Sequence, residues 1–252
     1  MSNSPVGPRI FAWAGAGLFA GSLLYFLFSY IVTFAEIAPG PVRAADVLTN
    51  LGLFTVFALH HSLFARERMR ALVVRSFSPA LERSVYVWAA SLMLIAVCAL
   101  WQPLPGVAWQ VRGPAAWLLA VVQLAGAWLS FRSAAVIDIW DLAGVRQISR
   151  TPNPQSPIPN SDPGSLTLGV GSWEFKTEGP YGWVRHPIYL GWFLLVFAVA
   201  TMTMTKLAFA LISCVYVLVA IPLEERSLRR ASAGLYEEYM RKVPWKLVPR
   251  LY

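Results

Sequence analysis

Two short blocks near the C-terminal end of the sequence combine residue types that bind small charged molecules. Arg185, His186 and Pro187 stand immediately before a long apolar run, and Glu224-Glu225 form an acidic pair after it. Proline is tolerated in the first turn of a helix, where free backbone N–H groups favour an anion. The acidic pair supplies acceptors for an ammonium group or for hydroxyls. Together the blocks favour a ligand that carries both a carboxylate and a cation.

The residues around these blocks extend the candidate ligand site. Tyr189 follows His186 by three positions, so the two side chains share one helix face. Aromatic rings such as that of Tyr181 attract cations to their faces, although Tyr and Trp also gather at membrane interfaces for other reasons. The candidate cofactor-binding residues are Gly179, Tyr181, Arg185, His186, Pro187, Tyr189, Gly191, Glu224 and Glu225.

Three polar residues inside or beside apolar runs form a candidate catalytic set: His61, Arg132 and Asp138. Charge in lipid is costly and tends to line a cavity, which places Arg132 or Asp138 in a substrate chamber. His61 would then accept a proton from the substrate. The structural alternatives are that Arg132 extends along its helix to the membrane surface or pairs with an acid, and that His61 is a buried, hydrogen-bonded histidine.

No metal site is expected. His60 and His61 are adjacent, and neighbouring residues on a helix point about 100° apart, with no third ligand spaced beside them. Cys98 and Cys214 lie in separate apolar runs without metal or redox spacing, where a small polarizable side chain packs well.

The composition requires a lipid environment for the elements that position these residues. Of the 252 residues, 57% are hydrophobic and only 13% are charged, and the mean hydropathy is +0.54. These values are far more apolar than those of a soluble domain of this length. We therefore expect one all-α integral membrane domain over residues 1–252.

Long charge-poor runs predict about six transmembrane helices, since a spanning helix needs about 20 mostly apolar residues. Only Lys206 separates the last two runs, which favours a tight helical hairpin. The expected spans are Ile10–Ala35, Val47–Ala65, Val85–Trp101, Ala115–Ile137, Ile188–Thr205 and Leu207–Leu223.

The positive charges predict the orientation of these helices. With a cytoplasmic N-terminus, most of the 21 Lys and Arg residues fall on the cytoplasmic side, where short loops retain them. Both termini and the C-terminal cofactor-binding region are therefore expected in the cytoplasm, with the helices in a bacterial inner membrane. This topology and attraction to anionic lipid heads explain the net charge of +8, so no nucleic-acid partner is expected.

The chain divides into three segments. Residues 10–150 hold the N-terminal transmembrane helices, and residues 173–252 hold the ligand-binding blocks with a helical hairpin and a C-terminal tail. Between them, residues 151–172 form a Pro-rich cytoplasmic loop, whose Pro, Ser, Asn and Gly residues favour turns. Such a loop is either a linker or a lid over the active site.

Ordered motifs in the C-terminal third support a family relationship. They are Gly179-Pro180-Tyr181, Arg185-His186-Pro187-Ile188-Tyr189-Leu190-Gly191, Glu224-Glu225, Tyr236-Glu237-Glu238-Tyr239 and Lys242-Val243-Pro244. In order and spacing they resemble the signature of the isoprenylcysteine carboxyl methyltransferase and phospholipid methyltransferase superfamily. Lys242 departs from the Arg that this family often has there, and Lys is a point charge rather than a planar fork. The resemblance implies that the candidate residues bind S-adenosylmethionine (SAM).

Separated motifs elsewhere narrow the resemblance. They are Leu59-His60-His61-Ser62, Leu81 to Val87, Trp101 to Gly106 and Asp141 to Gln147. These look like the bacterial methanethiol S-methyltransferase branch, which is also similar to membrane proteins named for nitrite and nitric oxide metabolism. The long Pro-rich insertion after Gln147 is atypical of that branch.

The resemblance implies SAM-dependent methyl transfer to a small thiol, with methanethiol giving dimethyl sulfide. Carboxyl or amine methylation of an isoprenylcysteine-like or lipid acceptor is the alternative enzyme function. A reductase-like nicotinamide site or a non-catalytic membrane protein on the same helical frame is a third reading. No Gly-x-Gly-x-x-Gly motif follows a predicted strand, so a soluble-type dinucleotide site is not expected. The sequence leaves the oligomeric state open.

Overall fold

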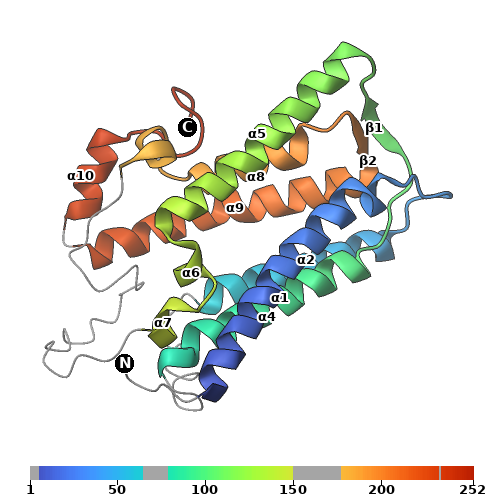
Figure 1. The fold of residues 1–252 in the computed structure, drawn as a ribbon. Helices are drawn as coiled ribbons and strands as arrows, with labels where there is room; N and C mark the ends of the chain where they lie inside the picture. Colours follow the sequence, from blue (N-terminus) through green and yellow to red (C-terminus); the bar gives the residue numbers. More distant parts are fainter. Residues whose placement is uncertain (1–5, 65–78, 150–176, 233) are drawn as a thin grey trace, which may run out of the picture.

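The computed structural model describes residues 6–64, 79–149, 177–232 and 234–252. Within these ranges the chain is mostly helical, and its long helices run between two ends of the molecule (Figure 1). The α-helices are α1 (Val6–Ile31), α2 (Ala44–Phe64), α4 (Glu82–Leu100), α5 (Pro114–Ile137), α6 (Ile139–Leu142), α7 (Arg146–Ser149), α8 (Pro187–Phe197), α9 (Met204–Ala231) and α10 (Leu235–Lys242). The shorter elements are the 3₁₀ helices η1 (Thr33–Ala35), η2 (Pro79–Leu81) and η3 (Gly179–Gly182), and the strands β1 (Val107–Gln110) and β2 (Thr201–Thr203). The expected Pro-rich loop, residues 151–172, lies outside the described residues.

Four helices of the described residues are long and apolar enough to cross a membrane: Val6–Ala35, Glu82–Leu100, Pro114–Ile137 and Met204–Arg230. They correspond to four of the expected spans and confirm a helical membrane protein. α2 occupies another expected span, but Asn50, His60 and His61 interrupt its apolar sequence. α8 is apolar but only 11 residues long. Spanning by α2 and α8 stays a prediction.

The expected helix over Ile188–Thr205 is wrong beyond Phe197. The chain is extended there, and β2 pairs antiparallel with β1. The Thr203 hydroxyl donates to the Phe34 carbonyl at 2.5 Å and accepts from the Lys206 backbone N–H at 3.2 Å, which caps α9. Lys206 therefore lies in the first turn of α9 rather than between two helices. The all-α expectation is wrong for this one strand pair.

Aromatic rings hold the long helices together. The side chain of Phe209 in α9 is fully buried. Its ring centroid lies 5.5 Å from that of Phe26 and 5.7 Å from that of Tyr30, both in α1. The rings of Phe54 in α2 and Trp101 after α4 lie 5.7 Å and 5.2 Å away. Burial of large rings dominates core energetics, so this cluster fixes α9 against three N-terminal helices.

The backbones of α5 and α8 approach closely at two glycines. A Cβ atom added to Gly191 of α8 would lie 2.6 Å from the Gly126 carbonyl oxygen of α5, and one added to Gly126 would lie 2.7 Å from the Gly191 carbonyl oxygen. Ser130 adds a hydrogen bond, because its hydroxyl donates to the Ile188 carbonyl at 3.1 Å. Small residues allow such close backbone approach between membrane helices. The start of α8 is therefore fixed relative to α5.

Both candidate blocks lie at one end of the bundle. Glu224 and Glu225 stand in the last turns of α9, at the end of the molecule that carries α10, whereas β1 and β2 lie at the opposite end (Figure 1). α1 begins at the same end as the acidic pair.

Candidate active site

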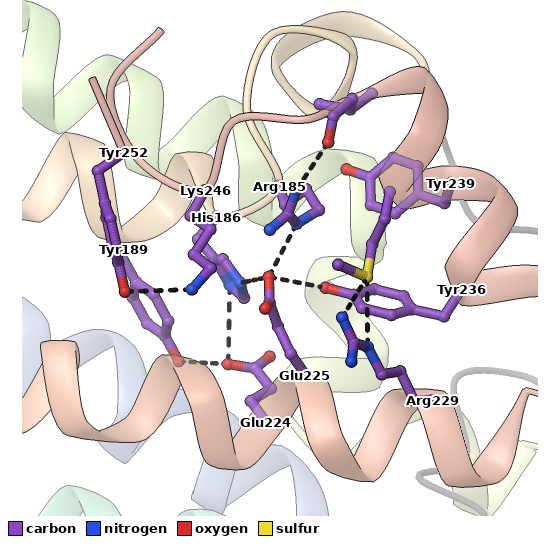
Figure 2. Close-up of polar contacts among 12 residues, drawn as sticks. Arg185, His186, Tyr189, Glu224, Glu225, Arg229, Tyr236, Tyr239, Lys246 and Tyr252 are labelled. Carbon is purple, nitrogen blue, oxygen red and sulfur yellow. Dashed lines mark hydrogen bonds and ion pairs between the residues drawn. The ribbon is translucent and has the colours of Figure 1, made fainter. Parts of the chain in front are cut away.

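Arg185 connects α9 to the segment that follows α10. Its Nε lies 2.8 Å from Glu225 Oε1 in a buried ion pair. Its Nη1 donates to the carbonyl oxygens of Val243 and Pro244 at 2.9 and 2.6 Å. Figure 2 shows the guanidinium of Arg185 between the Glu225 carboxylate and a backbone carbonyl. The planar fork of Arg is suited to such simultaneous donation, so Arg185 is committed to internal contacts.

Backbone pairing fixes the start of α8. The N–H groups of Arg185 and His186 donate to the carbonyls of Trp245 and Lys246, each at 2.9 Å. Pro187, which has no N–H group, occupies the first turn of α8. The chain after α10 therefore supplies the acceptors for the two residues that precede α8.

Glu225 is the centre of the buried network. Its Oε1 accepts from Arg185 Nε, and it lies 3.3 Å from both His186 Nε2 and the Tyr236 hydroxyl (Figure 2). The Glu225 residue is only 5% exposed. A buried carboxylate needs such partners, because an uncompensated charge in a low-dielectric interior is strongly destabilising.

Glu224 has a different environment. Its Oε2 accepts from the Tyr189 hydroxyl at 2.9 Å and lies 3.9 Å from His186 Nδ1. The rings of His186 and Tyr189 stack, with centroids 5.5 Å apart and planes 10° apart. The Glu224 side chain is 41% exposed. Among the described residues Oε1 has no hydrogen-bond partner, so this oxygen is open to a ligand.

Two tyrosines interact with the exposed carboxylate. The Tyr189 hydroxyl donates to it, and its charge acts on the hydroxyls of Tyr181 and Tyr189. Tyr86 of α4 in turn acts electrostatically on Tyr189. Burial, reinforced by Glu224, raises the pKa of the Tyr181 hydroxyl above its ordinary range. Tyr181 is therefore neutral at ordinary pH. We name Glu224, Tyr181 and Tyr189 the open cluster; aromatic faces beside a carboxylate suit a cationic ligand.

α10 covers the buried network. Tyr236 and Tyr239 are buried on its inner face, next to Leu228 and Val243. The Tyr239 hydroxyl donates to the Tyr181 carbonyl at 2.9 Å. Burial raises the pKa of both tyrosines above the ordinary range, so each remains a hydrogen-bond donor.

The structure thus separates the candidate cofactor residues into two groups. Arg185, His186 and Glu225 are buried and bonded to one another or to backbone, whereas Glu224, Tyr181 and Tyr189 form the open cluster. The glycines serve the backbone: Gly179 begins η3 with φ +57°, a region that favours glycine, and Gly191 lies at the crossing with α5.

The candidate catalytic residues do not come together. His61 Nδ1 lies 2.5 Å from the Tyr86 hydroxyl. Asp138 caps α6 by accepting from the N–H of Trp140, and its Oδ2 lies 2.7 Å from Arg146 Nε. Arg132 is exposed on α5. His61 is thereby joined to Tyr86, whose hydroxyl acts electrostatically on that of Tyr189 in the open cluster.

Sequence reasoning missed some members of the site. Tyr236 belongs to the Tyr236-Glu237-Glu238-Tyr239 motif. Its spacing of three residues from Tyr239 was the available signal, because such a spacing puts both side chains on one helix face. The backbone carbonyls of residues 243–246 gave no sequence signal, because any residue supplies one. Lys242, the family departure, pairs with Glu238 at 2.9 Å on the exposed face of α10.

Two motifs from the N-terminal half also meet. The Ser84 hydroxyl donates to the Gly144 carbonyl at 2.8 Å. A Cβ atom on Gly144, whose φ is +76°, would lie 3.0 Å from the Ser84 Cα atom. The start of α4 therefore packs directly on the turn between α6 and α7.

Comparison with known proteins extends the likeness over almost the whole chain. The model of the isoprenylcysteine carboxyl methyltransferase family matches residues 170–230. Methanethiol S-methyltransferase 2 of Bradyrhizobium diazoefficiens is 34% identical over 247 residues, which cover 96% of this chain and 90% of that protein. Methanethiol S-methyltransferase of Mycobacterium tuberculosis is 34% identical over 245 residues, covering 90% and 94%. Human nurim is 30% identical over 199 residues, covering 76% and 71%. No solved structure matches the chain.

Proposed function

The chain belongs to the methanethiol S-methyltransferase family, and from this premise we propose that it transfers the methyl group of SAM to methanethiol, forming dimethyl sulfide. It is a methyltransferase by family membership. The observation that carries the cofactor assignment is the contrast between the two neighbouring acids: Glu225 is enclosed in a network, and Glu224 keeps an open carboxylate oxygen.

The open cluster fits SAM by its chemistry. SAM carries an ammonium, ribose hydroxyls and a sulfonium, and when bound it supplies an electrophilic methyl group. Glu224 Oε1 can accept from the ammonium or a ribose hydroxyl, while the rings of Tyr181 and Tyr189 suit the cationic end. His186 and Tyr189 orient Glu224. In this proposal Arg185 and Glu225 do not contact the ligand. They hold α8, α9 and the chain after α10 in place.

The acceptor side needs little dedicated machinery. A thiol reacts as its thiolate, and an in-line displacement depends mainly on orientation and on exclusion of water. His61 is the acceptor-side residue that we favour, because its partner Tyr86 acts electrostatically on Tyr189 of the open cluster. Arg132 and Asp138 remain candidates for the substrate chamber.

We propose the same topology as the charge pattern. α1 begins and α9 ends at one end of the bundle (Figure 1), as expected for an even number of crossings with both termini in the cytoplasm of a bacterial inner membrane. In this arrangement α2 and α8 complete six crossings, and β1 with β2 lies on the outer side.

A lipid-like acceptor is the second candidate. The matching family model is named for isoprenylcysteine carboxyl methylation. An apolar groove of about 300 Å³ lies between α2 and α4, with Leu53 and Phe57 on one wall and Met93 and Val97 on the other. Such a groove suits a hydrocarbon chain better than it suits a one-carbon thiol.

Purified protein in lipid nanodiscs tests the choice between acceptors. With SAM and methanethiol, we expect dimethyl sulfide in the headspace, and none with either component omitted. Binding of SAM with turnover of an isoprenylcysteine-like thioether carboxylate, but not of methanethiol, would establish the second candidate instead. Failure to bind SAM would reject both.

A further inference from the structure

We propose that Tyr86 is a positioning residue for methyl transfer, whose hydroxyl orients the His61 imidazole so that its Nε2 accepts the proton of the thiol. The inference rests on the proposed function and assigns the acceptor side of the site to α2 and α4. Its starting observation is the 2.5 Å separation between the Tyr86 hydroxyl oxygen and His61 Nδ1.

The second ring nitrogen of His61 is available. The residue lies in the last turn of α2 and is exposed. Within the described part of the chain, His61 hydrogen-bonds to Tyr86 through Nδ1, and its Nε2 has no hydrogen-bond partner. A histidine with one nitrogen bound to a fixed partner and the other open is the arrangement that a general base requires.

Neighbouring side chains hold Tyr86 in place. Its ring stacks on that of His60, with centroids 5.7 Å apart and planes 9° apart. The Arg83 guanidinium lies over the Tyr86 ring, 5.0 Å from the centroid. Phe57 lies one turn before His61, with ring centroids 6.3 Å apart. These contacts restrict rotation of both members of the pair.

The pair adjoins the cofactor side. Tyr86 lies within electrostatic range of Tyr189, and the Tyr189 hydroxyl donates to Glu224. We place the thiol beside His61 and Tyr86, on the side of the open cluster that faces α4. The Arg83 cation, next to the same ring, favours a negative charge that forms there.

The proton balance determines the tautomer. When His61 donates its Nδ1 proton to the Tyr86 oxygen, Nε2 carries the lone pair. The thiol S–H bond breaks, a new N–H bond forms at Nε2, and the electron pair stays on sulfur. The thiolate sulfur then forms a bond to the methyl carbon as the bond from that carbon to the sulfonium sulfur breaks, and its electron pair remains on the departing sulfur. The His61 imidazolium afterwards releases its proton to water.

Two acceptors of similar size but different acidity test this role. Ethanethiol is mostly protonated at neutral pH, whereas 2,2,2-trifluoroethanethiol is far more ionised. For His61→Gln we expect kcat with ethanethiol to fall about 100-fold, and for Tyr86→Phe about tenfold, within the range of general-base contributions. With trifluoroethanethiol both losses should be several times smaller. SAM affinity, measured by calorimetry without acceptor, should be unchanged in both variants.

Tyr216→Phe is the matched control. Tyr216 also pairs its hydroxyl with a residue of α2, Thr55 Oγ1 at 2.5 Å, but not with His61. We expect equal, small effects on both thiols. Equal losses with the two thiols in His61→Gln and Tyr86→Phe would overturn the positioning role and leave the proposed function standing. A wild-type protein that binds SAM and methylates neither thiol would overturn the proposed function, and the role of the pair with it.

Discussion

Arg185 Nε and Glu225 Oε1 meet 2.8 Å apart in a place where both side chains are almost fully buried. The ion pair joins the residue before α8 to the last turns of α9. The Nη1 group of the same guanidinium donates to the carbonyls of Val243 and Pro244, beyond α10. One ion pair therefore assembles chain segments that are about 40 to 60 residues apart in sequence.

Glu225→Gln should unfold the site rather than only weaken a ligand contact. It leaves the Arg185 charge buried without its partner, which costs about 3 to 5 kcal/mol in comparable buried pairs. We expect a large fall in the thermal midpoint in detergent and the loss of SAM binding as a consequence. A variant of normal thermal midpoint that has lost SAM affinity would instead make Glu225 a direct ligand contact.

Glu224→Gln is the complementary change. The Glu224 side chain is 41% exposed, so the fold should be retained. SAM affinity should fall about 10- to 100-fold, because a charge-assisted hydrogen bond to the ligand is lost. Calorimetry measures the affinity, and Lys242→Ala, which removes only the exposed pair with Glu238, serves as the surface control with unchanged affinity. Unchanged affinity in Glu224→Gln would contradict the open cluster as the cofactor site.

Tyr236→Phe should change alkaline stability. The folded-state pKa of Tyr236 is raised, first by burial and then by Glu225. A raised pKa gives stability that is fully present below the unfolded pKa of about 10 and is lost as the pH rises above it. Tyr236→Phe should therefore lower the free energy of unfolding near neutral pH by about 1 kcal/mol, the value of one hydrogen bond. Between about pH 10 and about pH 12, above the unfolded pKa, the free energy of unfolding of the variant should fall less steeply with pH than that of the wild type. Equal alkaline slopes in denaturant titrations of the two proteins would contradict the assignment.

Gly191→Ala should separate α5 from α8. The added Cβ would overlap the Gly126 carbonyl oxygen, and overpacking of this kind costs about 1 to 3 kcal/mol. Gly17→Ala in α1, where no atom lies within 4 Å of the added Cβ, should be neutral or slightly stabilising. Thermal unfolding of both variants in detergent measures the difference, and equal midpoints would show that the crossing tolerates a methyl group.

The proposed topology predicts where attached reporters lie. A reporter after Tyr252 should be cytoplasmic, and one inserted next to Val107 of β1 should be outside. Alkaline phosphatase and green fluorescent protein fusions give opposite signals on the two sides. An external signal at the C-terminus would require an odd number of crossings.

The sequence predicted which residues come together better than it predicted the spans. Arg185, His186 and Glu225 do meet, because a short block before an apolar run and an acidic pair after it return to the same end of the helix bundle. What each one does was not predictable: Glu224 and Glu225 are adjacent, and only the helix rotation decides which one is buried.

The other differences have local causes. Hydropathy continues past Phe197, so a window of apolar residues gave no indication that the chain becomes extended and forms β2. The carbonyls that hold Arg185 belong to the backbone, which residue types do not reveal. Tyr86 was visible only as part of a family motif, because its contact with His61 joins two helices.

With the proposed cofactor site, the contact between Gly126 and Gly191 would set how deep the reaction lies in the bilayer. α5 is long enough to span the membrane, whereas α8 has only 11 residues. Because the two backbones approach so closely, α8 has little room to slide along α5. His186 precedes α8 and Tyr189 lies in its first turn, so the position of both follows that of α5. A longer or shorter hydrophobic segment in α5 should therefore shift the water exposure of the methyl donor, and lipid thickness becomes a variable that can alter the rate.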